Sequence, residues 1–594
     1  MLLSSEKIKS NHINIKQYSL KPTGIKSRVV GKWYKVLSLS TTVFEPSTFL
    51  HNSQLYLLKL QNHQIKPTAG NVFLCSSSSS SSSSPSLSPP FAFYSPKYHP
   101  NLLSSWMTSP AEVISGDLPT RTGISIGETV SFPDQVLILL KYPPSSPLLT
   151  KEEFACVYFS PNTSQKSYSS PLSIDGEYLG HQIVRCKVPP RGTIASVGLK
   201  ARVDHDLQPG PTHDWKSLAY EALIDRDNTT VVFVKGLNLR SGRPSNASKF
   251  ECVYGSGQLV LRSEVVSIAQ EIVRCKTPLS ILTRKPNDVK VSVKIKGRGV
   301  LDSIARPGLW AGPERPVLNK HMVCVCTMLR NQARFLPEWV MYHARIGVEH
   351  WFVYDNNSDD NVEEVIGLLM DQGFKISRHV WPWIKTQEAG FAHCALRARD
   401  FCKWVAFIDV DEFIHLPYGD RLGSVINNQS SRHDVAELRV SCHNFGPSGL
   451  KQVPLEGVTV GYTCRLGIPE RHKSIVRPDK LNPTLINIVH HFHLKDGFMH
   501  VNVDRNLMVI NHYKFQVWEV FKEKFYRRVA TYVSDWQQEE NVGSKDRAPG
   551  LGTRAVEPDD WSSRFCEIND TGLKDWVVKT FSDPLTGSLP WQQE

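Results

Sequence analysis

Residues 404–413 read Trp404-Val405-Ala406-Phe407-Ile408-Asp409-Val410-Asp411-Glu412-Phe413. An unbroken apolar run of this length predicts a buried strand. Two carboxylates, two positions apart, follow the run directly. Mg²⁺ and Mn²⁺ prefer oxygen ligands and keep positions open for phosphate oxygens. The stretch therefore predicts a central strand that ends in a metal site formed by Asp409 and Asp411, whose ion bridges the protein and a diphosphate.

Strands and helices alternate around this stretch, from about residue 318 to 590. The sequence predicts strands at 322–326, 351–354 and 376–380, and helices at 335–345, 361–372, 389–402 and 518–528. This order is typical of an α/β domain with a mostly parallel sheet. Ligands of such sheets bind beyond the carboxyl ends of the strands, so we expect the residues that end the strands to share one site.

Two other predicted strands end in polar residues. Thr327 and Arg330 follow the first strand, and a guanidinium is well suited to a diphosphate. Asp355 ends the second strand, where its carboxylate can accept hydrogen bonds from a ribose or a base. The Asn/Ser/Asp cluster at 357–359 favours a turn and a helix N-cap.

Eight motifs stand in a fixed order between about Val323 and Tyr526. They are Cys326-Thr327-Met328-Leu329-Arg330-Asn331, Glu338-Trp339-Val340-Met341-Tyr342-His343, Tyr354-Asp355-Asn356-Asn357-Ser358, Asp409-Val410-Asp411-Glu412-Phe413, Asn444-Phe445-Gly446-Pro447-Ser448-Gly449, His472-Lys473-Ser474-Ile475-Val476-Arg477-Pro478, His490-His491-Phe492-His493 and Asn511-His512-Tyr513-Lys514. Together they resemble the pattern of glycosyltransferase family 92, a family of the GT-A type. The preceding β-rich region resembles the accessory domain of plant members, such as those that make pectic β-1,4-galactan.

This resemblance implies an inverting glycosyltransferase that moves a hexose from a nucleotide sugar to a glycan acceptor. It further implies Mn²⁺ or Mg²⁺ at Asp409 and Asp411. By similarity to the galactan-making relatives, we expect a UDP-linked donor, galactose as the sugar and a cell-wall polysaccharide as the acceptor. The alternative is a catalytically silent glycan-binding protein.

The resemblance also implies a type II membrane protein of the Golgi. A membrane-spanning helix needs roughly 20 consecutive apolar residues. None precedes Trp106, so membrane association is an expectation from the family and the anchor is not visible.

An inverting transfer needs a general base that takes the proton of the acceptor hydroxyl. Glu470 stands just before the polar cluster 471–473, and we assign it this role. Glu437, Glu456 and Asp496 are the other candidates downstream of the metal site.

Histidines and basic residues cluster in the last third of the chain. In His-Phe-His, alternation places His491 and His493 on one face of a strand. His512 follows a predicted strand at 506–510. We consider these three histidines candidates for a third metal ligand or a diphosphate contact, and place Lys473 and Arg477 near phosphate or an acidic acceptor.

Aromatic residues gather at Trp381, Trp383 and Phe391. Sugar rings stack on such side chains, but core packing is the more common role, and we favour the core.

The first half of the chain has a different composition. Residues 1–115 contain a serine run at 76–84 followed by prolines, which predicts a disordered leader. Short apolar runs separated by turn residues fill 120–305 and favour a β-sandwich-like accessory domain. The catalytic domain is expected at 318–590.

The β-rich region contains an internal repeat, F-x-C-V-Y followed by I-V-R-C-K. Its cysteines are Cys156 and Cys186 in the first copy and Cys252 and Cys275 in the second. If the two strands of each copy pair antiparallel, the sulfurs meet, so we predict disulfides Cys156–Cys186 and Cys252–Cys275. The alternative is buried free thiols.

Composition excludes several classes of protein. Apolar residues make up 40% of the chain and charged residues 21%, as in ordinary globular proteins. The net charge is +12, but no Lys/Arg block of the nucleic-acid-binding kind occurs. No CxxC pairs with zinc spacing are present. Six glycosylation acceptors favour a secreted or lumenal setting: Asn162, Asn228, Asn246, Asn356, Asn428 and Asn569.

Overall fold

The structure is a computed structural model. It describes residues 123–143, 146–160, 165–178, 181–200, 206–240, 242–255, 260–284, 289–307, 319–418, 421–488, 490–532 and 557–592. All the described residues belong to one compact unit. The leader predicted at 1–115 and the glycosylation acceptor Asn162 lie outside the described residues.

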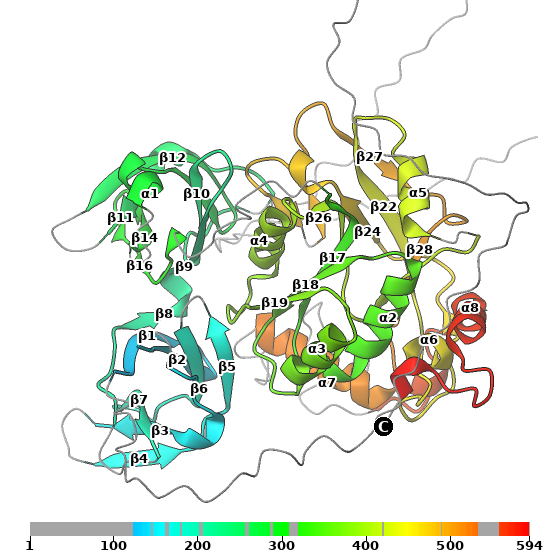
Figure 1. Ribbon diagram of the computed structural model, residues 1–594, viewed down its shortest axis with the longest axis horizontal. Helices are drawn as coiled ribbons and strands as arrows, with labels where there is room; N and C mark the ends of the chain where they lie inside the picture. Colours follow the sequence, from blue (N-terminus) through cyan, green and yellow to red (C-terminus); the bar gives the residue numbers. More distant parts are fainter. Residues whose placement is uncertain are drawn as a thin grey trace, which may run out of the picture. The chain divides into compact units, whose positions relative to one another are not determined.

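The site-bearing part of the chain is built on one large sheet with the order β19-β18-β17-β20-β24-β22-β28-β21 (Figure 1). Its strands are β17 (His321–Leu329), β18 (His350–Asp355), β19 (Ile376–Val380), β20 (Cys402–Phe407), β21 (Glu412–His415), β22 (Val435–Asn444), β24 (His472–Val476) and β28 (Val509–His512), with β27 (Met499–Asn502) paired to β22. The predicted strands at 322–326, 351–354, 376–380 and 404–408 all occur. The α/β class is therefore confirmed.

The sheet is mostly parallel, as predicted, since five of its eight strand pairings are parallel, including those of β22 with β27 and β28. The strands β17, β18, β19 and β20 run parallel. β24 is antiparallel to both β20 and β22, and β21 is antiparallel to β28, so the sheet is mixed. The apolar runs alone carry no information on strand direction, which the connecting segments decide.

Helices cover both faces of the parallel half. α2 (Leu336–Ile346) and α3 (Val362–Asp371) lie on one side of these strands and α4 (Gln387–Ala398) on the other (Figure 1). Residues of α2 and α3 join one hydrophobic cluster, whereas residues of α4 join another. α2 begins with a proline at its first turn and ends at Gly347, whose φ of 112° suits a left-handed C-cap. Trp381, Trp383 and Phe391 are buried in the second cluster, which confirms their assignment to the core.

The other elements of this part are short or peripheral. They are α5 (Leu422–Gln429), α6 (Val458–Gly461), α7 (Trp518–Tyr532), α8 (Gly572–Phe581), β23 (Cys464–Arg465), β25 (Asn487–Ile488), β26 (His491–Phe492) and β29 (Ile568–Asn569).

Residues 125–303 form the β-rich region. Their elements are β1 (Ser125–Ser131), β2 (Gln135–Lys141), β3 (Phe154–Phe159), β4 (Lys166–Ser169), β5 (Ser173–Tyr178), β6 (His181–Lys187), β7 (Ile194–Leu199), β8 (Thr212–Asp214), β9 (Leu218–Ile224), β10 (Thr229–Val234), β11 (Phe250–Tyr254), β12 (Leu261–Ala269), β13 (Ile272–Lys276), α1 (Leu279–Arg284), β14 (Val291–Ile295), β15 (Gly299–Val300) and β16 (Asp302–Ser303). The first eight strands divide between the five-stranded sheet β5-β6-β2-β1-β8 and the three-stranded sheet β4-β3-β7. Side chains of both sheets share one core. β9 to β16 form a separate eight-stranded sheet.

Both predicted disulfides are present, but the strands that carry them do not pair. Cys156 in β3 and Cys186 in β6 belong to different sheets, so their bond joins the two sheets. Cys252 in β11 and Cys275 in β13 are separated by β12 within one sheet. Three further bonds lie in the other part of the chain: Cys324–Cys402, Cys326–Cys394 and Cys464–Cys566.

The repeat also places one arginine at the same position of each copy. Arg185 is buried and donates from Nη2 to the carbonyl of Ser358, in the turn that follows β18, at 2.5 Å. Arg274 donates from Nε to the carbonyl of Pro483 at 3.1 Å. The repeated motif therefore supplies both a disulfide and a buried contact to the chain after residue 318.

Glu338 of α2 holds the start of the short helix α6. Its carboxylate accepts hydrogen bonds from the backbone N–H groups of Val458 and Thr459 at 2.8 and 2.9 Å, and from the Thr459 hydroxyl at 2.6 Å. A carboxylate is favourable at a helix N-terminus, where free N–H groups point outward. Burial nevertheless raises the pKa of Glu338 to about 6.

We expect Glu338→Ala to lower the free energy of unfolding by about 2–4 kcal/mol, because buried donors lose their acceptor. Thermal unfolding measures this as a drop in midpoint of several degrees. Glu364→Ala, an exposed glutamate in the first turn of α3, is the control and costs at most about 1 kcal/mol. Equal midpoints for the two variants would contradict the role given to Glu338.

Candidate active site

Four strands and one helix bring charged side chains to the carboxyl end of β20. Glu412 in β21 pairs with His512 in β28, and His512 also pairs with Asn444 at the end of β22. The antiparallel register of β24 on β20 places Lys473 beside the residues that follow Phe407. Pairing between strands far apart in the sequence therefore assembles the site.

Asp409 is the more accessible carboxylate of the pair. Its side chain is 32% exposed, and Oδ2 lies 3.2 Å from Lys473 Nζ and 3.6 Å from His490 Nε2. Its backbone N–H donates to Oε2 of Glu412 at 3.0 Å. Burial alone would raise the pKa of Asp409, but the positive charge of Lys473 outweighs it and lowers the pKa.

Asp411 is more deeply placed, with a side chain only 8% exposed. Its Oδ2 forms an ion pair with Lys524 of α7 and lies 3.3 Å from Nε2 of His512. Burial favours the neutral acid, but Lys524 and His512 outweigh it and hold the pKa of Asp411 well below its usual value. Both aspartates are therefore ionised at neutral pH.

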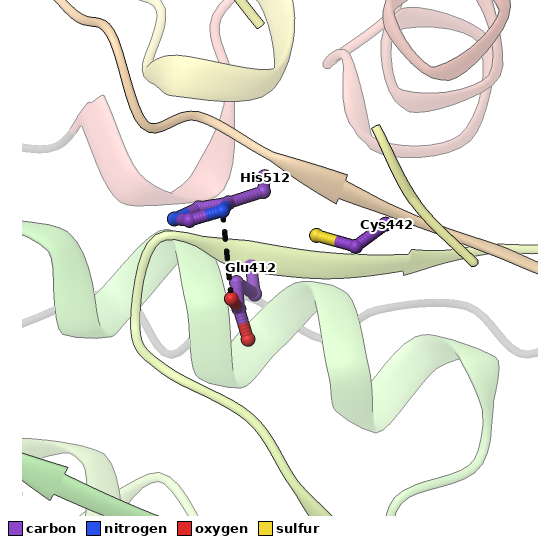
Figure 2. Close-up of side chains that lie close together, drawn as sticks. All are labelled: Glu412, Cys442 and His512. Atoms are coloured by element: carbon purple, nitrogen blue, oxygen red, sulfur yellow. Dashed lines mark ion pairs between the residues drawn. The ribbon is translucent and has the colours of Figure 1, made fainter. Parts of the chain in front are cut away.

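Glu412 lies beneath the two aspartates and is fully buried. Its Oε1 is 2.7 Å from Lys473 Nζ and 3.6 Å from Nδ1 of His512, and Cys442 points its sulfur toward this pair (Figure 2). Donor atoms of Glu412, Cys442 and His512 all lie within 4.8 Å of one another. Burial raises the pKa of Glu412 despite the nearby Lys473.

The donor set fits a divalent cation. Asp409 and Asp411 offer ionised carboxylate oxygens, and His512 adds a ring nitrogen 3.3 Å from one of them. Mn²⁺ and Mg²⁺ accept such ligands. In the structure Lys524 and Lys473 balance the aspartates, so this edge of the sheet already stabilises positive charge.

Three of the residues predicted to bind the donor lie in or just after strands β17 and β18, and their surroundings differ. Thr327 lies inside β17, not after it; its buried hydroxyl has no hydrogen-bond partner among the described residues. Arg330 is partly exposed and pairs with Asp359 at 3.3 Å. Asp355 is buried, and its two oxygens accept from Arg378 and from the Ser358 N–H, so its contact with a ribose or base stays a prediction.

The turn that follows β18 is not the helix N-cap that the sequence favoured. The N-cap of α3 is Asn361. Ser358 Oγ instead accepts from the N–H of Asn331, and the amide of Asn357 donates to the carbonyl of Pro382. These bonds fix the loop after β18 against the loops after β17 and β19.

Lys473 and Arg477 lie toward opposite ends of β24. Lys473 contacts both Asp409 and Glu412. Arg477 follows Val476, which pairs with Val405 in β20. The guanidinium of Arg477 donates to the carbonyl of His433. The structure brings Lys473 into the site and directs Arg477 away from it, because three strand residues separate them.

Among the three predicted histidines, only His512 contacts the aspartates. His491 contacts Ser474 and Glu437, on the other face of β24. β26 contains only His491 and Phe492, and His493 is exposed. The expected alternation of these two histidines along a strand is therefore wrong, since the strand ends before His493.

Glu470 lies close to this site. Its N–H donates to the carbonyl of Cys442, and its carboxylate, 52% exposed, lies 3.1 Å from Lys514 Nζ. Burial acts to raise the pKa of Glu470, but Lys514 outweighs it and lowers the pKa. Of the alternatives, Glu437 is buried and bonded to Ser474, whereas Glu456 and Asp496 are exposed.

Sequence reasoning missed Lys524 and His490 as members of the site. His490 has a φ of 70°, and its Nε2 lies 2.7 Å from Lys473 Nζ. Burial and the charge of Lys473 lower the pKa of His490 to about 3, so the ring is neutral and accepts from the lysine. The histidine pair at 490–491 was a visible signal, whereas nothing in α7 distinguishes Lys524 from its neighbours.

The structure also bears on the predicted glycosylation acceptors and on the predicted membrane attachment. Four glycosylation acceptors are exposed, namely Asn228, Asn246, Asn428 and Asn569. Asn356 is buried, with its amide bonded to the carbonyls of Trp381 and Trp383, and is thus unsuited to glycosylation. Among the described residues, no helix is long and apolar enough to cross a membrane.

Comparison with known proteins gives one consistent result. The family model of glycosyltransferase family 92 matches residues 319–543. A glycosyltransferase family 92 protein of Ricinus communis is 63% identical over 84% of this chain and 93% of its own length. Another, from Oryza sativa subsp. japonica, is 50% identical over 83% of this chain and 89% of its own length.

More distant similarities are weaker. A galactan beta-1,4-galactosyltransferase of Arabidopsis thaliana is 27% identical over 18% of this chain and 23% of its own length. Among solved structures, a mannosyltransferase of Pyrobaculum calidifontis, in complex with GDP-Man and Mn²⁺, covers 40% of this chain and 69% of its own. Its identity is 13% and its TM-score 0.24, too low to support an inference.

Proposed function

The chain belongs to glycosyltransferase family 92, and on that premise we propose that it is an inverting, metal-dependent hexosyltransferase that uses a nucleotide sugar. The observation that carries this proposal is the group Asp409, Asp411 and His512 at the carboxyl end of β20. These residues would hold the cation. A bound Mn²⁺ or Mg²⁺ would neutralise the charge that develops on the leaving nucleoside diphosphate.

The protein's own residues prepare the site for this reaction. Lys473 contacts both Asp409 and Glu412 and keeps the carboxylates oriented. Arg330, partly exposed beyond the end of β17, is the basic group assigned to the donor's diphosphate. Positive groups fixed in advance stabilise developing negative charge without further rearrangement.

We assign Glu470 as the base that removes the proton of the acceptor hydroxyl. Its exposed carboxylate is ionised at neutral pH because Lys514 lowers its pKa. The proton moves from the hydroxyl to Glu470 as the sugar–phosphate bond breaks, and attack on the opposite face of the sugar inverts its configuration.

The sugar and acceptor are proposed from a relative. The similarity to a galactan beta-1,4-galactosyltransferase supports galactose as the sugar and a galactan-type polysaccharide as the acceptor. We further propose UDP as the carrier and a cell-wall polysaccharide as the acceptor, on the family resemblance. The family resemblance also supports a Golgi membrane location. Localisation of a fluorescent fusion of the full-length protein tests that part, and a cytosolic signal would overturn it.

The test of the proposed function is release of nucleoside diphosphate from a panel of nucleotide sugars with glycan acceptors, with Mn²⁺ and with a chelator. We expect turnover of UDP-galactose that the chelator abolishes. Turnover of another donor would keep the enzyme and replace the sugar. A folded protein that turns over no donor, yet binds a glycan, would favour the catalytically silent alternative.

A further inference from the structure

A second cluster of titratable side chains lies on the face of β24 opposite Lys473. In the register of β22 on β24, Glu437 lies opposite Val476 and Ser441 opposite His472. Residues that alternate along a strand share one face, so Glu437, His472 and Ser474 are on one face and Lys473 on the other. The cluster is therefore separate from the aspartates, which Lys473 contacts.

Three side chains that can ligate a metal, one carboxylate and two imidazoles, meet in this cluster. A carboxylate oxygen of Glu437 and ring nitrogens of His472 and His491 all lie within 4.8 Å of one another. The centroids of the two histidine rings are 4.0 Å apart. Glu437 is buried, while both histidines are partly exposed, so the cluster is reachable from solvent.

Ser474 orients two of these side chains. Its hydroxyl donates to Oε1 of Glu437 at 2.5 Å, and its oxygen lies 2.8 Å from Nδ1 of His491. Because the hydroxyl has one proton, which the carboxylate receives, Nδ1 of His491 must be the donor in the second bond. The proton on Nδ1 leaves Nε2 of His491 with a free lone pair, as in a metal-binding histidine held by a neighbouring acceptor.

Two buried atoms of the cluster have no hydrogen-bond partner in the described part of the chain. They are Nε2 of His472 and Oε2 of Glu437. The negative charge of Oε2 is balanced by an ion pair with Nη2 of Arg439 at 3.2 Å. A buried polar atom left unbonded is costly, so a ligand bound by Nε2 of His472 would remove that cost.

We propose that Glu437, His472 and His491 bind one transition-metal ion of the zinc class. Two imidazoles and one carboxylate are a donor set that zinc accepts, with a fourth position left for water. The set differs in kind from the aspartates of the active site, which suit oxygen-seeking cations. Ser474 acts as the residue that positions two of the ligands.

The test is zinc content of the full-length, untagged protein after removal of metals and equilibrium dialysis against Zn²⁺ with excess Mg²⁺. We expect His472→Ala and His491→Ala each to hold one zinc fewer than the unmodified chain. Any zinc bound by Glu412, Cys442 and His512 is retained in both variants. The difference in zinc content between a variant and the unmodified chain therefore reports only the proposed site. Ser474→Ala keeps all ligands and is expected to weaken binding about 10-fold.

Thermal unfolding supplies an independent readout. Zn²⁺ raises the unfolding midpoint of the unmodified chain, since it binds the folded state, and the increase disappears in His491→Ala. His433→Ala, which removes an exposed histidine outside the cluster, is the control and retains both effects. Equal zinc content in His491→Ala and the unmodified chain, or an equal loss in His433→Ala, would overturn the proposal.

Discussion

Asp409→Asn is expected to lower kcat/KM for sugar transfer at least about 1000-fold, or about 4 kcal/mol of transition-state stabilisation. The amide nearly preserves the shape of the side chain but removes the negative charge that a hard cation requires. Asp409 is the better choice than Asp411, because it is 32% exposed, whereas Asp411 is buried against Lys524. Initial rates at several donor and Mn²⁺ concentrations measure the effect.

The fold of Asp409→Asn should persist. Lys473 keeps its ion pair with Glu412 at 2.7 Å after Asp409 loses its charge. Asp371→Asn, an exposed aspartate at the end of α3, is the matched control and should retain full activity. Asp409→Asn with more than a tenth of the original kcat/KM would rule out the assigned metal site.

Glu470→Gln is expected to lower kcat about 100- to 10,000-fold, the range that a general base contributes. The KM for the donor should change little, because Glu470 is assigned to the acceptor. Glu456→Gln, also an exposed glutamate, is the control and should retain kcat. Unchanged kcat in Glu470→Gln would remove Glu470 as the base.

The pH dependence of kcat separates a base from a merely structural glutamate. Lys514 lowers the pKa of Glu470 against the opposing effect of burial, so the unmodified enzyme loses activity only as the pH falls below the ordinary glutamate range. Lys514→Met removes that charge and raises the pKa of Glu470. Its activity should therefore begin to fall at a higher pH than that of the unmodified enzyme. Superimposable profiles would contradict the assignment.

The sequence predicted the central strand β20 better than the strands β24 and β28, which come later in the chain. The apolar run at 404–408 was long enough to identify β20. The positions of Asp409 and Asp411 followed from that strand alone, because they come directly after it. The direction of β24 and β28 was not predictable, because those strands are four or five residues long and pair with partners far along the chain. Parallel and antiparallel neighbours leave the same apolar pattern in such short runs.

The same limit applies to the site. His512 was singled out at the end of a predicted strand, and the structure places its ring beside Asp411. Lys524 reaches Asp411 from α7, 113 residues later in the chain, and no local pattern marks it. His491 was grouped with His493 by alternation, but β26 is too short for that pattern to apply.

The most direct test of the account is binding of UDP, measured by titration calorimetry with Mn²⁺ and with a chelator. We expect that the unmodified chain binds UDP only with Mn²⁺, that Asp409→Asn loses this binding, and that Glu470→Gln retains it. Asp409→Asn that binds UDP with Mn²⁺ as tightly as the unmodified chain would contradict the claim that the carboxylates after β20 hold the metal and, through it, the donor.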